Sequence, residues 1–334
     1  MFQPDRRLAN HVLNSFLTLV MPAIMVIVFC SSTIDLACAQ EATSGDPLLK
    51  RRISDLEAEN RALRKIIAEI LASVKDVPGT SNTAKPNADG LRIIVLPDDW
   101  GDSRIEDMKK VVDSAAHPLA SQLNAASSFA PVIIQRSKSG PITLYQRGAG
   151  NEYVVRLDSS DRAWAQLAFQ FAHEFCHIIC NYRNVNNPQM WFEETICEVA
   201  SLYSLRKMGE TWKTNPPYSN WNTYAEALTD YARTRIAEQA DNSQTLADFY
   251  RENSAALEEK GTNRKLNNFI AVKLLPHFEA DPTGWQAIQY LNLGNAKENK
   301  TLSAYLSAWH QRVPKNQRDF VALIAREFEI KLVE

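Results

Sequence analysis

The apolar run over residues 171–179 constrains this chain most, because it places three titratable side chains inside hydrophobic sequence. It reads Phe-Ala-His-Glu-Phe-Cys-His-Ile-Ile. Residues four apart lie on one face of an α-helix, so His173 and His177 can bind one metal ion together, with Glu174 beside them. Such groups need partners when they are buried, since an unpaired polar group is costly to remove from water. We therefore predict a buried helix, ending near residue 181, that carries a metal site.

The residues before this helix predict a small sheet. Strand-like apolar runs are separated by a helical stretch over 103–124 and by Ser-Gly-Pro and Gly-Ala-Gly-Asn turns. Short turns between the later strands predict a mostly antiparallel sheet, with strand 152–157 as an edge that pairs with an extended peptide. The predicted strands are 91–96, 131–136, 142–147 and 152–157.

The second half of the chain, from residue 200, predicts helices only. Its apolar residues recur at spacings of three and four, and Asp-Pro-Thr-Gly and Val-Pro segments break the pattern. The predicted helices are 224–239, 245–260, 265–277 and 320–331.

The N-terminus has the pattern of an export segment. Arg6 and Arg7 precede an apolar run over 16–30, and Ala37-Cys38-Ala39 forms an A-x-A cleavage pattern. The run is shorter than the roughly 20 residues of a spanning helix. We predict a signal peptide over 1–39, with an uncleaved membrane anchor as the alternative. Both place the rest of the chain outside the cytoplasm, as a periplasmic or secreted protein or one anchored to a membrane.

Residues 47–76 carry a heptad pattern that favours a short parallel coiled coil, and residues 77–90 have the composition of a linker. The coiled coil implies a homodimer; the alternative is a single amphipathic helix lying on the rest of the protein. The heptad seam consists of Leu49, Ile53, Leu56, Asn60, Leu63, Ile67, Ile70 and Val74.

Composition and cysteine usage narrow the class of protein. The 334 residues are 45% hydrophobic and carry a formal net charge of −2, so we expect a globular protein without a nucleic-acid partner. Beyond the leader the cysteines are Cys176, Cys180 and Cys197. In an oxidising compartment Cys197 can bridge to either of the other two; alternatively all three are small buried residues.

A catalytic metal needs a third protein ligand and an open position for water. The segment Trp191–Thr195 reads Trp-Phe-Glu-Glu-Thr and resembles the Trp-Leu-x-Glu-Gly segment that follows His-Glu-x-x-His in gluzincin zinc metallopeptidases, the thermolysin-like and aminopeptidase N-like enzymes. The resemblance implies that Glu194 completes a Zn²⁺ site with the two histidines of the motif. It also implies that Glu198 fixes a zinc histidine through its other ring nitrogen. We expect Glu193 to be a solvated surface acid.

The same resemblance implies an α+β fold and a peptidase. A zincin-like catalytic subdomain over 91–210 would precede an all-helical subdomain over 211–334, with the cleft between them. Glu174 would be the catalytic base in the hydrolysis of a peptide or protein substrate. The enzymes of this group also carry an oxyanion-stabilising Tyr or His. Asn267 and Asn268 stand at its expected place, and the other candidates are Tyr218, Tyr224, Tyr231, Tyr250 and His277.

Alternatives remain open at this stage. The Gly-x-Met-Glu-Asn segment with which aminopeptidases capture a free amine has only the dissimilar Gly148–Glu152 stretch as a counterpart, which argues against aminopeptidase activity. Endo- and exopeptidase modes are both left open. One alternative is a catalytically inactive zincin-fold scaffold of the envelope, dimerised by its coiled coil. Another is a structural coiled-coil protein in which His-Glu-x-x-His occurs by chance.

Overall fold

The computed structural model describes residues 90–123, 129–239 and 243–333. All of them belong to one compact unit. The predicted signal peptide, the coiled coil and all but the last residue of the predicted linker lie outside these ranges, so those interpretations stay predictions. In the described ranges no helix is long and apolar enough to cross a bilayer.

The first part of the unit forms a four-stranded sheet in the order β1-β2-β4-β3. Three strands are parallel: β1 pairs with β2, and β2 pairs with β4 from Val132 opposite Tyr153 to Arg136 opposite Leu157. Only β3 runs antiparallel, against β4. The elements are β1 (Ile93–Val95), α3 (Ile105–Ala120), β2 (Val132–Arg136), β3 (Ile142–Thr143) and β4 (Tyr153–Leu157).

Two predictions about this sheet are wrong. The sheet is mostly parallel because helix α3 crosses over between β1 and β2, and such a connection returns the chain in the same direction. The short turn after β2 does not make a hairpin with β2, since β3 pairs with β4 instead. As a result β4 is an interior strand, and the free edge beside the motif helix belongs to β3.

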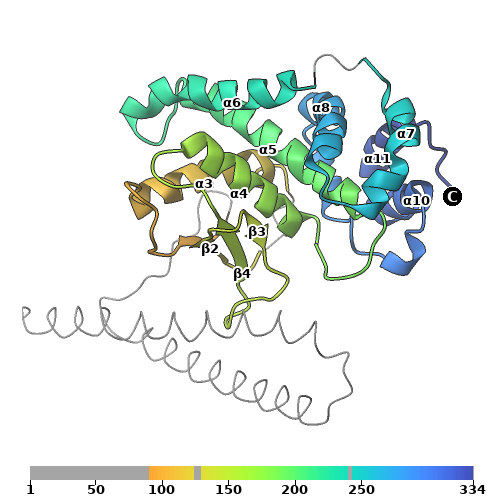
Figure 1. Cartoon of the computed structure of the whole chain (residues 1–334), viewed down its shortest axis with the longest axis horizontal. Coiled ribbons are helices and arrows are strands. Elements are labelled where there is room, and N and C mark those ends of the chain that lie inside the picture. Colours follow the sequence, from red (N-terminus) through yellow and green to blue (C-terminus); the bar gives the residue numbers. More distant parts are fainter. Residues whose placement is uncertain (1–89, 124–128, 240–242, 334) are drawn as a thin grey trace, which may run out of the picture. The chain divides into compact units, whose positions relative to one another are not determined.

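Helices make up most of the rest of the unit, which is therefore a mixed fold of a small sheet and many helices (Figure 1). Helices α3 and α4 contact the sheet, α5 contacts both of them, and α6 and α8 pack on α5. The α-helices are α4 (Trp164–Ile179), α5 (Met190–Trp212), α6 (Ala225–Ala237), α7 (Leu246–Glu259), α8 (Arg264–Ala280), α9 (Gly284–Ile288), α10 (Leu302–Arg312) and α11 (Arg318–Glu327).

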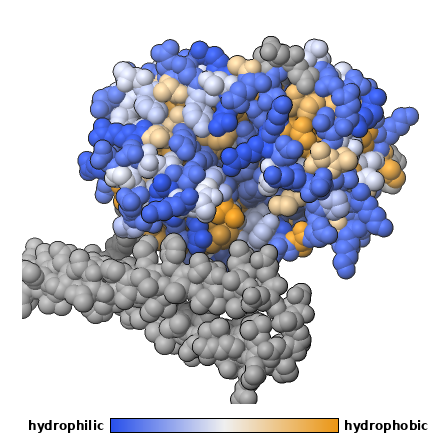
Figure 2. Space-filling model, viewed as in Figure 1, coloured by the Kyte–Doolittle hydropathy of each residue, from blue (hydrophilic) through white to orange (hydrophobic). Residues whose placement is uncertain are grey.

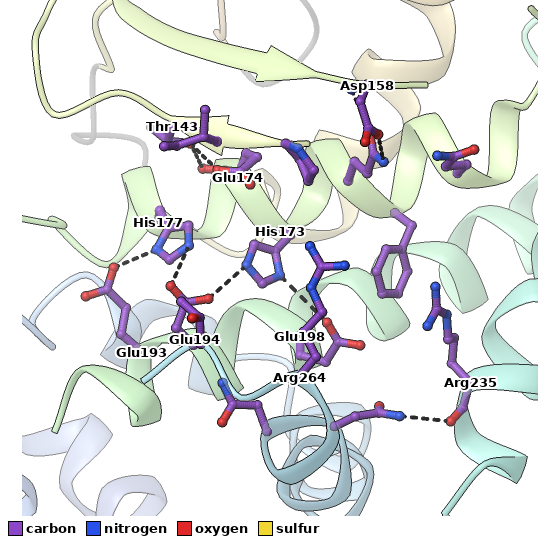
Figure 3. A pocket seen from close by; sticks show the side chains of 18 of the residues that line it. Thr143, Asp158, His173, Glu174, His177, Glu193, Glu194, Glu198, Arg235 and Arg264 are labelled. Carbon is purple, nitrogen blue, oxygen red and sulfur yellow. Dashed lines mark hydrogen bonds and ion pairs between the residues drawn. The ribbon is translucent and has the colours of Figure 1, made fainter. Parts of the chain in front are cut away.

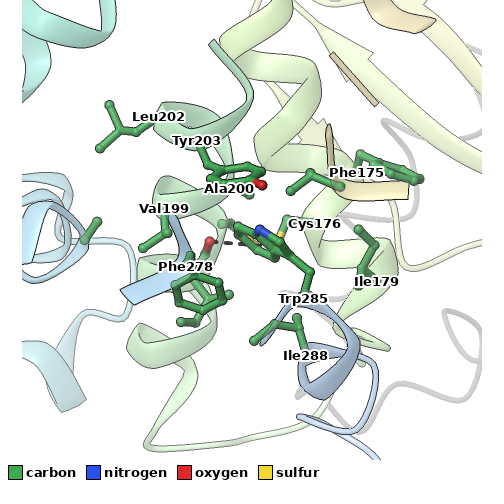
Figure 4. Close-up of a cluster of buried hydrophobic side chains, with 14 of the residues drawn as sticks. Phe175, Cys176, Ile179, Val199, Ala200, Leu202, Tyr203, Phe278, Trp285 and Ile288 are labelled. Carbon is green, nitrogen blue, oxygen red and sulfur yellow. Dashed lines mark hydrogen bonds between the residues drawn. The ribbon is translucent and has the colours of Figure 1, made fainter. Parts of the chain in front are cut away.

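Helix α5 is the centre of the unit. It has buried side chains on all sides, from Trp191 to Trp212, as expected for a helix that is surrounded by other elements. One buried cluster around it is shown in Figure 4, where the ring of Tyr203 of α5 lies 5.3 Å from that of Trp285 of α9, and Val199 of α5 and Phe175 of α4 belong to the same cluster. Because α5 lies between α4 and the later helices, its position fixes how the two halves meet at the motif.

Candidate metal centre

The motif histidines lie on α4 and face α5, as Figure 3 shows. Glu194 of α5 lies between them: its Oε2 is 3.4 Å from His173 Nε2, and its Oε1 is 3.7 Å from His177 Nε2. The rings of the two histidines meet edge to face, with 5.1 Å between centroids. The packing of α4 against α5 thus brings together the three residues that the sequence predicts as metal ligands.

Cys197 is a second candidate for a third ligand. It lies one turn after Glu194, and its Sγ is within 4.8 Å of a nitrogen of each histidine. Cys197 is fully buried and does not line the cleft, whereas Glu194 and both histidines do. A catalytic metal must keep one position open toward the substrate, so Glu194 fits such a site better than Cys197 does.

The prediction that Glu193 is a solvated surface acid is wrong. Its side chain is buried, and its Oε1 lies 2.6 Å from His177 Nδ1. Its other oxygen, Oε2, accepts a hydrogen bond of 2.6 Å from the side-chain amide of Asn292, whose Oδ1 in turn accepts one from the hydroxyl of Tyr305. Asn292 and Tyr305 were not predicted as part of the site, because no sequence pattern near residues 292 and 305 links them to the motif.

Glu198 lies on the other side of the site, beside His173. Its Oε2 is 3.8 Å from His173 Nδ1, which allows electrostatic attraction but is too long for a hydrogen bond. Both histidines therefore have a carboxylate at Nδ1 and Glu194 at Nε2, but the contact behind His177 is the shorter one. This is the arrangement that orients histidines toward a metal ion, with Nδ1 held from behind and Nε2 free to bind.

Glu174 points from the same helix toward the sheet and is almost fully buried. Its Oε2 accepts a hydrogen bond of 2.7 Å from the hydroxyl of Thr143, on edge strand β3 (Figure 3). The same hydroxyl lies 3.0 Å from the main-chain oxygen of Glu174. Thr143 thus ties the carboxylate to the edge strand at the cleft, a positioning role that was not predicted from the sequence.

The carboxylates dominate the electrostatics of the site. Burial alone would lower the pKa of His177, but the hydrogen bond to Glu193 and the charge of Glu194 raise it to about 9. Burial would also lower the pKa of His173, yet Glu194 and Glu198 raise it well above its usual value. Burial would raise the pKa of Glu194, but its contact with His173 and the charge of His177 hold it below the usual range. The site thus favours positive charge, as a cation-binding site must.

The cysteines lie behind this site in the core. Cys176, Cys180 and Cys197 are free thiols, and all three are fully buried. Cys197 therefore forms no bridge to either of the other two, although the three Sγ atoms lie within 4.8 Å of one another. Of the two alternatives considered from the sequence, the structure agrees with small buried residues.

A cleft of about 610 Å³ opens over the candidate ligands. It is lined by β3 on one side and by α6 and α8 on the other, with Glu174, His173 and His177 between them. Among the tyrosines and the histidine proposed for the oxyanion, only Tyr231 lines it; Tyr145 and Tyr182 line it as well and were not predicted. The face shown in Figure 2 is mostly hydrophilic, with hydrophobic residues only in small separate patches.

A scan against models of known protein families finds no match for this chain, and neither does a search of curated proteins. What the protein does must therefore be inferred from the chemistry of the site itself.

Proposed function

We propose that the protein is a zinc-dependent peptidase of the gluzincin type, which hydrolyses peptide bonds in the cleft above α4. The observation that carries the proposal is the convergence of His173, His177 and Glu194 on one point at the cleft floor, with Glu174 beside them. Two imidazoles and one carboxylate are a ligand set that zinc hydrolases use, and they leave a position for water.

The surroundings of the ligands also support the proposal. Carboxylates behind both histidines favour the tautomer that presents Nε2 to a metal. The order of the elements also fits, since a sheet with one antiparallel edge strand precedes the motif helix and a helical half follows it. We therefore extend the proposal to a zincin-like fold for residues 91–210 and a helical subdomain for residues 211–334.

The reaction divides between the metal and the chain. Zn²⁺ in this site would lower the pKa of a bound water and polarise the scissile carbonyl. Glu174 accepts the proton of the attacking water and delivers it to the leaving amine. Thr143 keeps the Glu174 carboxylate on the side of the edge strand, where an extended peptide can pair with β3.

A second candidate function is that of an inactive zincin-fold scaffold, assembled as a homodimer through residues 47–76. It is favoured by one observation: helix α8 presents Asn267 and Asn268 to the cleft, where the resembling enzymes place a Tyr or His for the oxyanion. The intact set of Glu174 and three ligands favours the peptidase, because a scaffold does not need a buried base beside the metal.

Metal analysis and a peptide library test the proposal together. We expect about one zinc per chain, lost in His177→Ala and kept in Cys197→Ala, and cleavage that is abolished in Glu174→Gln while its zinc remains. Cleavage that survives Glu174→Gln would refute the mechanism. Absence of stoichiometric zinc, or zinc that is unchanged by His177→Ala, would refute the metal site. Zinc binding without cleavage of any peptide by the wild type would favour the scaffold.

A further inference from the structure

The helical side of the cleft carries positive charges that the proposed hydrolysis does not use. Arg235 of α6 and Arg264 and Lys265 of α8 line the cleft opposite β3, and we call these three residues the basic wall. Figure 3 shows Arg264 reaching from α8 toward the side of the site where His173 and Glu198 lie.

None of the carboxylates of the cleft forms a hydrogen bond or ion pair with Arg264 or Lys265, since each carboxylate has a partner elsewhere; Arg264 acts on Glu194 only through the field of its charge. Arg235 forms a long ion pair with Glu238, with 4.0 Å between its Nη1 and Glu238 Oε2. No hydrogen bond or ion pair joins Arg264 or Lys265 to any residue in the described part of the chain. The other partnered carboxylates are Asp158 with Gln170, Glu174 with Thr143, Glu193 with His177, and Glu194 and Glu198 with His173.

The position of the two unpaired cations is unfavourable for the helix that bears them. Arg264 and Lys265 are the first two residues of α8, and the first turn contains no acidic residue. Positive side chains at a helix N-terminus repel the partial positive charge of the unsatisfied N–H groups there. A bound anion would pair with the two cations and relieve their repulsion by the helix end, because the side chains and the helix end both attract negative charge.

The adjacent turn of α8 offers acceptors. Asn267 and Asn268 are 4% and 6% exposed and line the same cleft. Their amide groups donate to the main-chain oxygens of Gly261 and Arg235, which fixes both side chains, yet neither Oδ1 has a hydrogen-bond partner. Buried acceptors without partners are uncommon, and in a cleft they point to a donor that arrives with a ligand, such as a peptide N–H.

We propose that the basic wall binds a carboxylate of the substrate, with Arg264 as its main contact, so that the peptidase prefers peptides bearing a negative charge near the scissile bond. The inference rests on the proposed function. An arginine guanidinium matches a carboxylate in shape and binds it through paired hydrogen bonds, and the acceptors of Asn267 and Asn268 suit the main-chain N–H groups of the same peptide. The carboxylate is that of an Asp or Glu side chain or of the peptide C-terminus.

Matched peptide pools test the inference and separate the two sources. One pair of pools differs only in a free or amidated C-terminus, and a second pair differs only in Glu or Gln at a fixed internal position. Wild-type protein should cleave one charged pool with a KM about tenfold below that of its neutral counterpart, and Arg264→Gln should remove this difference. Arg264 is exposed and forms no hydrogen bond or ion pair with the described residues, so the variant should fold normally. Arg233→Gln, on α6 outside the cleft, is the matched control and should behave as the wild type.

The other outcomes distinguish failure of the carboxylate site from failure of the peptidase proposal. Equal cleavage of charged and neutral pools by the wild type would overturn the inference and leave the peptidase proposal intact. A fall in kcat for all pools in Arg264→Gln, with the KM values unchanged, would also overturn it and would assign Arg264 to the oxyanion. Zinc-loaded Glu174→Gln should bind the preferred pool in fluorescence anisotropy. If the wild type binds that pool but cleaves nothing, the carboxylate site stands and the peptidase proposal fails.

Discussion

The contact between Glu193 and His177 gives the sharpest quantitative prediction. Replacing Glu193 by Gln leaves the shape of the side chain but removes its charge. The buried carboxylate accepts from His177 at 2.6 Å and from Asn292 at 2.6 Å. An amide can accept from only one of them, and it then presents its NH₂ group to a second donor. A hydrogen bond to a charged group contributes roughly 1.5–3 kcal/mol, which corresponds to a loss of zinc affinity of about 10- to 100-fold.

Competition with a chromophoric zinc chelator measures this loss, and far-UV circular dichroism checks that the variant is folded. Glu198→Gln should cost less than about fivefold, because its contact with His173 is 3.8 Å long and such ion pairs contribute at most about 1 kcal/mol. Glu210→Gln is a control near the C-terminal end of α5, where the exposed Glu210 pairs with Lys207. Wild-type zinc affinity in Glu193→Gln, or a larger loss in Glu198→Gln, would refute the role given to Glu193.

Four further outcomes are expected. Thr143→Val should lower kcat about tenfold without changing zinc affinity, because it removes the hydrogen bond to Glu174 but no metal ligand. Steady-state kinetics and a zinc titration measure the two quantities, and a joint fall of kcat and zinc affinity would contradict the prediction. Calorimetry in buffers of different ionisation enthalpy should detect proton release on zinc binding at pH 7, since His177, with its pKa raised to about 9, must lose a proton to bind the metal and the pKa of His173 is raised as well. Zinc affinity should still be rising with pH at the pKa of His177, about 9, because the protonated ring cannot bind the metal, and a pH-independent affinity would contradict this. Gly209→Ala should lower the denaturation midpoint despite the better helix propensity of Ala, because a Cβ there would lie 2.3 Å from Thr229 Oγ1; a higher midpoint would contradict the clash.

The sequence predicts where helices and strands lie much better than how they are joined. The motif helix ends at Ile179, near its predicted end, and all four strands lie within their predicted ranges, although β3 covers only Ile142–Thr143 of 142–147; apolar periodicity reports local structure. Strand direction was predicted wrongly because alternation is the same in parallel and antiparallel strands. The predicted and the observed sheet differ in whether β3 lies between β2 and β4 or pairs with β4 alone, and that choice is made by tertiary packing.

The candidate site shows the same limit. The helical spacing predicts His173 and His177 as ligands and the resemblance of residues 191–195 to the gluzincin segment implies Glu194, and the structure brings the three together. The burial of Glu193 could not be foreseen, because its position one residue before Glu194 gives no sign of which way it faces. Its partner Asn292 is far away in the sequence, in the loop after α9. Local patterns identify ligands, whereas the groups that hold those ligands come from the assembled fold.

The chain from Tyr305 through Asn292 to Glu193 has a consequence for the order in which the protein matures. During synthesis the residues from His173 to Glu198 leave the ribosome well before Asn292 and Tyr305 do. A nascent chain therefore has its ligands before it has the support for His177, and we expect it to hold metal weakly at that stage. Tight retention of the ion becomes a property of the finished molecule, so metal content would report whether the last helices have docked.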